Sequence, residues 1–358
     1  MTRNFKHVKI ITMKIFYSPD HIYHAPKAEL HRGAMVSPHE GPHRMEMLMA
    51  GMKKQGFTDF QTAPSCDLND ITAVHSAEYI DFLQTAWARW SAAGYSGDVL
   101  PMSYPYNQRR ASPPKDIDGA AGYFCTSSDT VVTQTSWRAL KSIADITVGA
   151  VQSITTSRNT GESAFILSRP PGHHAGANYM SGYCLLNFTA IAAQALQNND
   201  VARTAILDVD FHHGNGTQDI FYARDDVLFT SIHGEPDYHF PYFWGHKDEV
   251  GQGKGEGFNV NYPLPAGSTY EIWRAALTDA LSKIKKFGAQ ALIVSLGVDT
   301  YEHDPISSFK LKQPDYHDYG AAIATLGLPT IFIMEGGYGV PEIGSNTANA
   351  IQGFVNKN

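Results

Sequence analysis

The sequence predicts an α/β protein in which a parallel sheet is covered by helices on both faces. Three observations support this fold class: short apolar runs rich in β-branched residues recur along the chain, segments with apolar residues every three or four positions lie between them, and polar loops containing glycine follow most of the runs. Near-continuous apolar strands that alternate with amphipathic helices are typical of a buried parallel sheet.

Six apolar runs are the expected strands, at residues 14–17, 164–168, 204–207, 227–232, 291–298 and 330–334. The first opens after Met13, so residues 1–12 are interpreted as an extension. Histidine, aspartate or tyrosine residues follow each of the other five runs, in RPPGHHA, DVDFHHG, HG, D and EGGYG. Ligands of such sheets bind outside the carboxyl ends of the strands, so these side chains are expected to converge on one edge.

The expected helices cover residues 137–154, 190–197 and 270–287, the last ending at Gly288 as a C-cap. Residues 87–122 are rich in Pro, Gly, Tyr and Ser and show no clear period, and about 87–115 are interpreted as an inserted loop with a packing or interface role. No internal repeat or Ser/Gly linker divides the chain, which predicts a single domain over residues 1–358.

The composition excludes several classes of protein. With 28 Lys+Arg against 35 Asp+Glu in 358 residues, the net charge of −7 argues against nucleic-acid binding. The three cysteines form no CxxC pair, which argues against a disulfide framework and a cysteine zinc site. No run approaches the ~18–20 apolar residues of a membrane span, and no signal peptide is apparent, so a cytoplasmic location is expected.

A metal site is predicted where the run 204–207 ends. Asp208, Asp210 and His212 alternate, so on a strand they would share one face, although a partly exposed acidic strand end would look similar. Asp299 favours the metal, because an acid at the end of a buried strand is costly unless it is paired or metal-bound. Two carboxylates and one imidazole fit catalytic zinc, and this oxygen-rich set leaves Fe(II), Co(II) or Mn(II) as alternatives.

Two further groups are candidates for catalysis at the same edge. His173 and His174 follow the rigid Arg-Pro-Pro-Gly loop and can act as a general base and then an acid, although a lone histidine is more often structural. Tyr338 lies between glycines that let the backbone turn and the side chain point inward, where its hydroxyl can stabilise an oxyanion. A buried aromatic side chain is the simpler alternative for Tyr338.

At these residues the chain resembles the zinc-dependent histone deacetylase superfamily. The matching motifs, in family order, are RPPGHHA (169–175), SGYCLLN (181–187), ILDVDFHHGNGTQD (206–219), SLGVDT with HDP (295–305) and MEGGYG (334–339). The tract 116–130, the insertion before it and the run 240–257 are most similar to the bacterial acetylpolyamine amidohydrolases. The resemblance extends from about Met13 to Phe354 and implies the arginase/deacetylase fold, an eight-stranded parallel sheet between helices.

The resemblance also implies roles for single residues. The zinc ligands would be Asp210, His212 and Asp299, and the catalytic groups His173, His174 and Tyr338. Asp208 would orient His173 and hold a structural potassium ion with Ser231 and nearby carbonyls, and a second monovalent ion would lie near Phe221, Arg224 and Val227. The remaining positions are Tyr183 and Phe240 as walls of an acyl-amine tunnel, Asp118 and Asp129 as its acidic mouth, and Asn215 as the partner of His174.

The expected activity is hydrolysis of acetylated polyamines and diamines to acetate and free amine. The substrate would be a small cationic acetylated amine, and the insertion would build a homodimer interface that narrows the mouth against bulky proteins. Three alternatives remain: a broad acetyl-lysine or small-amide deacetylase, an arginase-like ureohydrolase with two manganese ions, and a non-catalytic sensor of acetylated amines.

Overall fold

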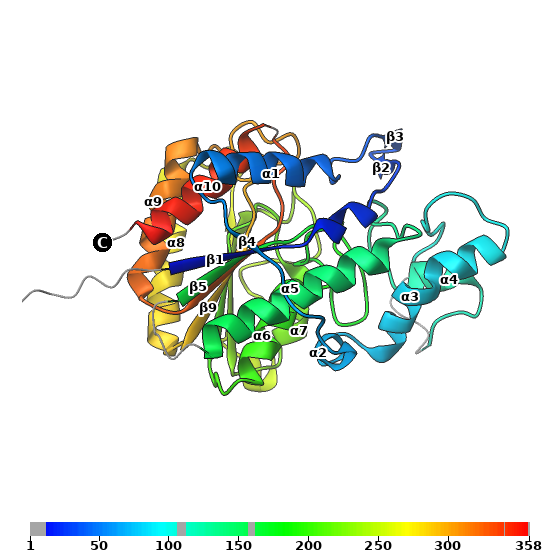
Figure 1. Ribbon diagram of the computed structural model, residues 1–358, viewed down its shortest axis with the longest axis horizontal. Helices are drawn as coiled ribbons and strands as arrows, with labels where there is room; N and C mark the ends of the chain where they lie inside the picture. The colour runs from blue at the N-terminus through cyan, green and yellow to red at the C-terminus, as the bar shows by residue number, and fades with distance from the viewer. Residues whose placement is uncertain (1–11, 106–111, 157–161, 340, 357–358) are drawn as a thin grey trace, which may run out of the picture.

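The computed structural model describes residues 12–105, 112–156, 162–339 and 341–356, and its centre is an eight-stranded sheet (Figure 1). The strand order is β4-β1-β5-β10-β9-β6-β7-β8, and every neighbouring pair is parallel. The strands are β1 (Thr12–Tyr17), β4 (Phe60–Gln61), β5 (Glu162–Leu167), β6 (Thr204–Asp208), β7 (Val227–Gly234), β8 (Asn259–Leu264), β9 (Ala291–Leu296) and β10 (Thr330–Met334). The predicted fold class and the eight parallel strands are confirmed.

Helices cover both faces of the sheet, and each face has its own apolar core. On one face lie α1 (His43–Lys54), α8 (Tyr270–Phe287), α9 (Gln313–Ile323) and α10 (Glu342–Val355); on the other lie α5 (Ser136–Thr156), α6 (Phe188–Gln197) and α7 (Asn215–Phe221) (Figure 1). Successive strand residues point to opposite faces: Ile166 belongs to the core that contains residues of α5 and α6, whereas Phe165 belongs to the core that contains residues of α1. Because both faces are apolar, the strand sequences are nearly continuous runs.

The helices predicted from periodicity are present with small shifts at their ends. The helix α8 has the predicted bounds, and Gly288 caps it in the left-handed conformation with a φ of 73°. The helix α6 begins two residues early because the Asn187 side chain accepts a hydrogen bond from the Ala190 amide and so caps the first turn. None of the described helices has the length and apolar character needed to cross a membrane.

Several helices and strands were not predicted from the sequence pattern. The strand β8 points Asn259 and Asn261 into the protein, where both amides donate to the side-chain oxygen of Gln218, so its inner face is not apolar. The segment expected as a loop from residue 87 is helical to Ala92, the end of α3, while residues 106–111 of that insertion and residues 1–11 lie outside the described part. The helices α1, α7, α9 and α10 and the strand β4 were not predicted either. The remaining elements not predicted are β2 (Glu29–His31), β3 (Ala34–Val36), α2 (Leu68–Thr72), α3 (Ala77–Ala92), α4 (Ile117–Tyr123) and three short 3-10 helices (Pro19–Tyr23, Gly253–Gly255, Ala324–Leu326).

The order of the central strands explains how distant motifs meet. The strands β5, β10, β9 and β6 are adjacent, and the four polar motifs follow their carboxyl ends. All four loops therefore emerge side by side at one edge of a parallel sheet, as the sequence predicts.

Candidate active site

A cluster of three metal-ligating side chains lies at this edge. Carboxylate oxygens of Asp210 and Asp299 and a ring nitrogen of His212 all lie within 4.8 Å of one another. The His212 Nδ1 atom is 3.0 Å from the Asp299 carboxylate and 3.4 Å from that of Asp210. The strand β6 ends at Asp208, so Asp210 and His212 converge with Asp299 through the loop after the strand rather than as alternate residues on it.

Backbone amides hold the two carboxylates in place. Asp299 accepts hydrogen bonds from the amide of Phe211 at 2.8 Å, and Asp210 accepts from Gly336 at 2.8 Å. A Cβ atom at Gly336 would lie 2.5 Å from the Asp210 carboxylate and 2.6 Å from that of Asp299. The glycine in the loop after β10 is therefore required by the close approach of both acids.

The donor set fits a divalent cation. Asp210 and Asp299 are completely buried, and burial, together with the adjacent Asp210 charge, raises the pKa of Asp299 to about 8. Two buried carboxylates this close repel each other, and a cation between them removes that repulsion. Two acids and one imidazole also leave a coordination position open, as catalytic zinc sites do.

The paired histidines differ in their partners. The His173 Nδ1 atom lies 3.0 Å from the Asp208 carboxylate, and although burial opposes it, the Asp208 and Asp210 charges raise the pKa of His173 to about 10. The His174 Nδ1 atom lies 2.7 Å from Oδ1 of Asn215, an oxygen that only accepts, so Nδ1 carries the proton and Nε2 is left with a lone pair. Burial, and then the charges of His173 and His212, hold the pKa of His174 well below its ordinary value.

Tyr338 lines the same cavity as both histidines. Its backbone amide donates to the Asp304 carboxylate at 2.7 Å, and the Arg44 guanidinium carbon lies 4.7 Å from the centre of its ring. Arg44 also donates to the carbonyl of Gly337 at 2.8 Å. The loop and the ring are therefore fixed from two sides.

Residues that the sequence analysis missed support these loops. Glu335 accepts hydrogen bonds from the amides of Gly172 at 2.6 Å and His173 at 3.1 Å, which ties the loop after β10 to the loop after β5. Glu40 is buried between Arg44 and Arg169, at 3.2 and 2.9 Å. Glu335 lies in a quoted motif and could have been noticed, whereas no local signal marks Glu40.

The site opens into a cavity of ≈ 910 Å³ whose walls include predicted substrate residues. Phe240 packs edge-on against His174, with 4.9 Å between ring centres, and the Tyr183 ring lies 5.7 Å from that of Tyr338. Asp129 also lines the cavity. Asp118, in the first turn of α4, is not among the described lining residues, and its carboxylate accepts a hydrogen bond from the amide of Met102. The structure thus brings Asp129, but not Asp118, to the cavity.

The residues assigned to the two monovalent ions lie in two places, one near the cluster and one at the far end of α7, where Phe221 and Val227 are buried and Arg224 is partly exposed. Asp208 and Ser231 face each other in the register of β6 and β7, and both are completely buried. Phe221 ends α7, Val227 begins β7, and the Arg224 amide donates to the Phe221 carbonyl at 3.0 Å between them. No side chain of the second group belongs to the catalytic cavity among the residues that the structure describes.

The chain is similar to known proteins over nearly its whole length. Residues 38–354 match the histone deacetylase domain family. The chain is 48% identical over 345 residues to an acetylpolyamine amidohydrolase of Mycoplana ramosa, which covers 96% of this chain and 100% of the relative, and 48% identical to acetylpolyamine amidohydrolase 2 of Pseudomonas aeruginosa, which covers 96% and 98%. A crystal structure of an acetylpolyamine aminohydrolase from Burkholderia pseudomallei superposes with a TM-score of 0.91 at 34% identity, and covers 97% of this chain and 99% of that chain. The chain belongs to the histone deacetylase family.

Proposed function

We propose that this deacetylase hydrolyses N-acetylated diamines and polyamines to acetate and the free amine. The observation that carries the proposal is the convergence, in one cavity, of the Asp210–His212–Asp299 cluster with a neutral histidine and a tyrosine. The names of the relatives that are 48% identical over nearly the whole chain support the substrate class.

Each residue has a role that follows from its surroundings. A divalent ion such as zinc, held by Asp210, His212 and Asp299, would supply Lewis-acid polarisation of the acetyl group and acidify the attacking water. His174 takes the proton of that water at Nε2, and the Tyr338 hydroxyl donates to the oxyanion that forms. As the carbon–nitrogen bond breaks, His174 returns the proton to the amine.

The ions at the remaining sites are part of the same proposal. We assign potassium to the Asp208–Ser231 site, because a buried carboxylate and hard oxygen donors suit a cation there. Asp208 would then both bind the potassium ion and orient His173, whose Nδ1 atom it contacts. Zinc is favoured over Fe(II), Co(II) and Mn(II) by the family, and elemental analysis of the isolated protein distinguishes them.

The preference for a slim cationic substrate is supported by the cavity walls. Phe240 and Tyr183 would offer apolar surface to methylene groups, and the Asp129 carboxylate in the lining would suit a distal ammonium. The exposed aromatic residues Tyr238, Tyr242 and Phe243 crowd the same lining. A folded protein surface could not enter such a cavity as easily as an alkylamine.

A turnover panel on enzyme of measured metal content tests the proposal. Acetylputrescine, acetylcadaverine and acetylspermidine should be hydrolysed with a far higher kcat/KM than an acetyl-lysine peptide, and folded acetylated proteins should react slowest. Equal rates on folded proteins would refute the polyamine preference and favour a broad acetyl-lysine deacetylase.

A further inference from the structure

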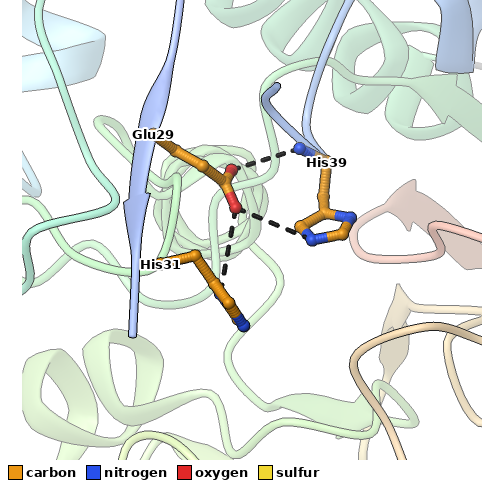
Figure 2. Close-up of side chains that lie close together, drawn as sticks. All are labelled: Glu29, His31 and His39. Carbon is orange, nitrogen blue, oxygen red and sulfur yellow. Dashed lines mark hydrogen bonds and ion pairs between the residues drawn. The ribbon is translucent and has the colours of Figure 1, made fainter. Parts of the chain in front are cut away.

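The side chains of Glu29, His31 and His39 form a second cluster of metal-ligating groups, outside the catalytic one (Figure 2). One ligand atom from each of the three lies within 4.8 Å of the others. The Glu29 Oε1 atom is 4.0 Å from Nδ1 of His31 and 3.8 Å from Nε2 of His39. Figure 2 shows one carboxylate oxygen of Glu29 facing both imidazole rings.

The hairpin of β2 and β3 brings the cluster together. Glu29 and His31 are two positions apart on β2, so their side chains lie on the same face of the hairpin. Arg32 and Gly33, with φ of 48° and 85°, form the tight turn, after which the chain returns to place His39 beside Glu29. The amide of His39 donates to Glu29 Oε2 at 3.1 Å, which leaves Oε1 facing the two rings.

No hydrogen bond between ring and carboxylate accounts for the position of the two imidazoles. Distances of 3.8 and 4.0 Å are too long for either ring to hydrogen-bond the carboxylate. Glu29 is only 2% exposed, and in the part of the chain that the structure describes no lysine or arginine forms an ion pair with it. A buried carboxylate is costly unless a cation pairs with it, and a metal ion held between the carboxylate and the two rings would supply that charge.

Two imidazoles and one carboxylate are ligands of zinc and similar transition-metal ions. Zinc bonds of about 2.0–2.2 Å place ligand atoms somewhat closer than they lie here, and rotation of the imidazoles can close the gap. The His31 and His39 side chains are 39% and 30% exposed, so an ion can reach them from solvent. The Tyr183 hydroxyl donates to Glu29 Oε1 at 3.3 Å and orients the carboxylate from behind, as outer-shell groups of metal sites do.

We propose that Glu29, His31 and His39 bind a divalent transition-metal ion at the rim of the catalytic cavity, separately from the Asp210–His212–Asp299 cluster. His31 lines that cavity, and so does Tyr183. An ion there adds positive charge to the wall along which a substrate enters. If the proposed function holds, the ion opposes cationic substrates: it raises their KM and leaves kcat unchanged.

The site is tested first by zinc content, without substrate. The full chain and a His31→Ala/His39→Ala variant are dialysed against buffered free Zn²⁺, and bound zinc is measured by elemental analysis. Wild type should hold about one zinc per chain more than the variant. A His43→Ala/His317→Ala variant removes two other exposed histidines and should bind as much as wild type. Equal zinc in wild type and the His31→Ala/His39→Ala variant overturns the site.

Two more variants separate this site from the catalytic one. Asp210→Asn should lose one zinc and keep the outer one, whereas Glu29→Gln should lose the outer one. Excess zinc should raise the KM of acetylputrescine in wild type but not in the His31→Ala/His39→Ala variant, and should leave the KM of a neutral acetylated alkylamine unchanged. An unchanged KM for acetylputrescine in wild type overturns the inferred charge effect. If wild type binds more zinc than the His31→Ala/His39→Ala variant but hydrolyses no acetylated amine, the metal site stands and the proposed function is refuted.

Discussion

Tyr338 is positioned by its backbone and its ring rather than by its hydroxyl. Its amide and that of Gly339 both donate to the Asp304 carboxylate, at 2.7 and 3.0 Å, and Arg44 lies against the ring. Removal of the hydroxyl oxygen alone therefore leaves these supporting contacts intact.

A Tyr338→Phe variant should show a kcat lowered by about 10²–10³-fold on acetylputrescine, because a donor to the oxyanion is lost. The KM should change little, and the thermal unfolding midpoint should stay that of wild type, because the contacts that fix the ring remain. Steady-state kinetics and a melting curve give both values. Undiminished turnover would remove Tyr338 from the mechanism.

Among single residues, those that follow strand ends could be predicted from the sequence. Those whose role depends on tertiary contacts could not. Asp210, His212 and Asp299 were predicted as a cluster because apolar strands end just before them. Arg44 carries no such signal, since it donates to the carbonyls of Glu335 and Gly337, which lie far along the chain. Asp118 was expected at the cavity mouth but is not among the described residues that line the cavity. The position of an acid in α4 cannot be predicted before the packing of that helix is known.

Among the elements, the loop after β10 is the most constrained. Gly336 approaches the buried carboxylates so closely that no side chain fits there, whereas Gly339 in the same loop has room for one. A Cβ atom at Gly336 would meet Asp210 and Asp299 at 2.5 and 2.6 Å, whereas the nearest atoms to a Cβ at Gly339 are 3.5 Å away.

A Gly336→Ala variant should therefore lose both its catalytic metal and nearly all of its activity, since the two ligands must move apart. Gly339→Ala is the matched control in the same loop and should keep the metal and most of the rate. Elemental analysis and turnover on acetylputrescine measure both variants. Full zinc content in Gly336→Ala would contradict the tight packing of this loop.

The elements that periodicity predicted are those buried on both faces or amphipathic along their whole length. The strand β10 and the helix α8 have the bounds that were expected. The strand β4 has two residues and β8 points asparagines inward, so neither gives an apolar run. The segment from residue 87 was expected to be irregular, but its first turns complete α3, where Trp90 is buried.

Across the whole molecule, one buried acid joins the N-terminal segment to the catalytic edge. Glu40 pairs with Arg44 of α1 and with Arg169 of the loop after β5, and Arg169 donates to the carbonyls of His21 and His24. Burial opposes it, but the charges of Arg169 and Arg44 hold the pKa of Glu40 below its ordinary value.

A Glu40→Gln variant leaves two buried guanidinium groups without their counter-ion and should lower the free energy of unfolding by about 3–5 kcal/mol. The contribution of Glu40 is complete above the ordinary Glu pKa of about 4.3 and is lost as the pH falls below it. Urea unfolding at several pH values should therefore show the difference from wild type shrinking in acid. Asp20→Asn, which breaks the exposed pair with Arg138, should cost far less because solvent screens it.

The homodimer remains a proposal, and the described ends of the insertion offer a surface for it. Met102 is 87% exposed, Tyr95 and Tyr104 are also exposed, and Tyr104 lines the cavity. A Met102→Asp variant should shift the protein from dimer to monomer in sedimentation velocity, because a charge is costly inside an apolar interface. Ile272→Asp changes another exposed apolar residue, on α8, and should not alter the assembly. A monomeric wild type would exclude the interface.

The two ends of the strands in the parallel sheet differ in function. Catalytic groups occupy the carboxyl ends of the strands, whereas β1 starts and α10 ends at the same side of the molecule, near the beginnings of the strands (Figure 1). A fusion partner or a solid support attached through either terminus would therefore leave the opening of the catalytic cavity accessible to substrate in solution. The fold suits tethered biocatalysts and tandem fusions, in which the anchored end and the working end have to point in opposite directions.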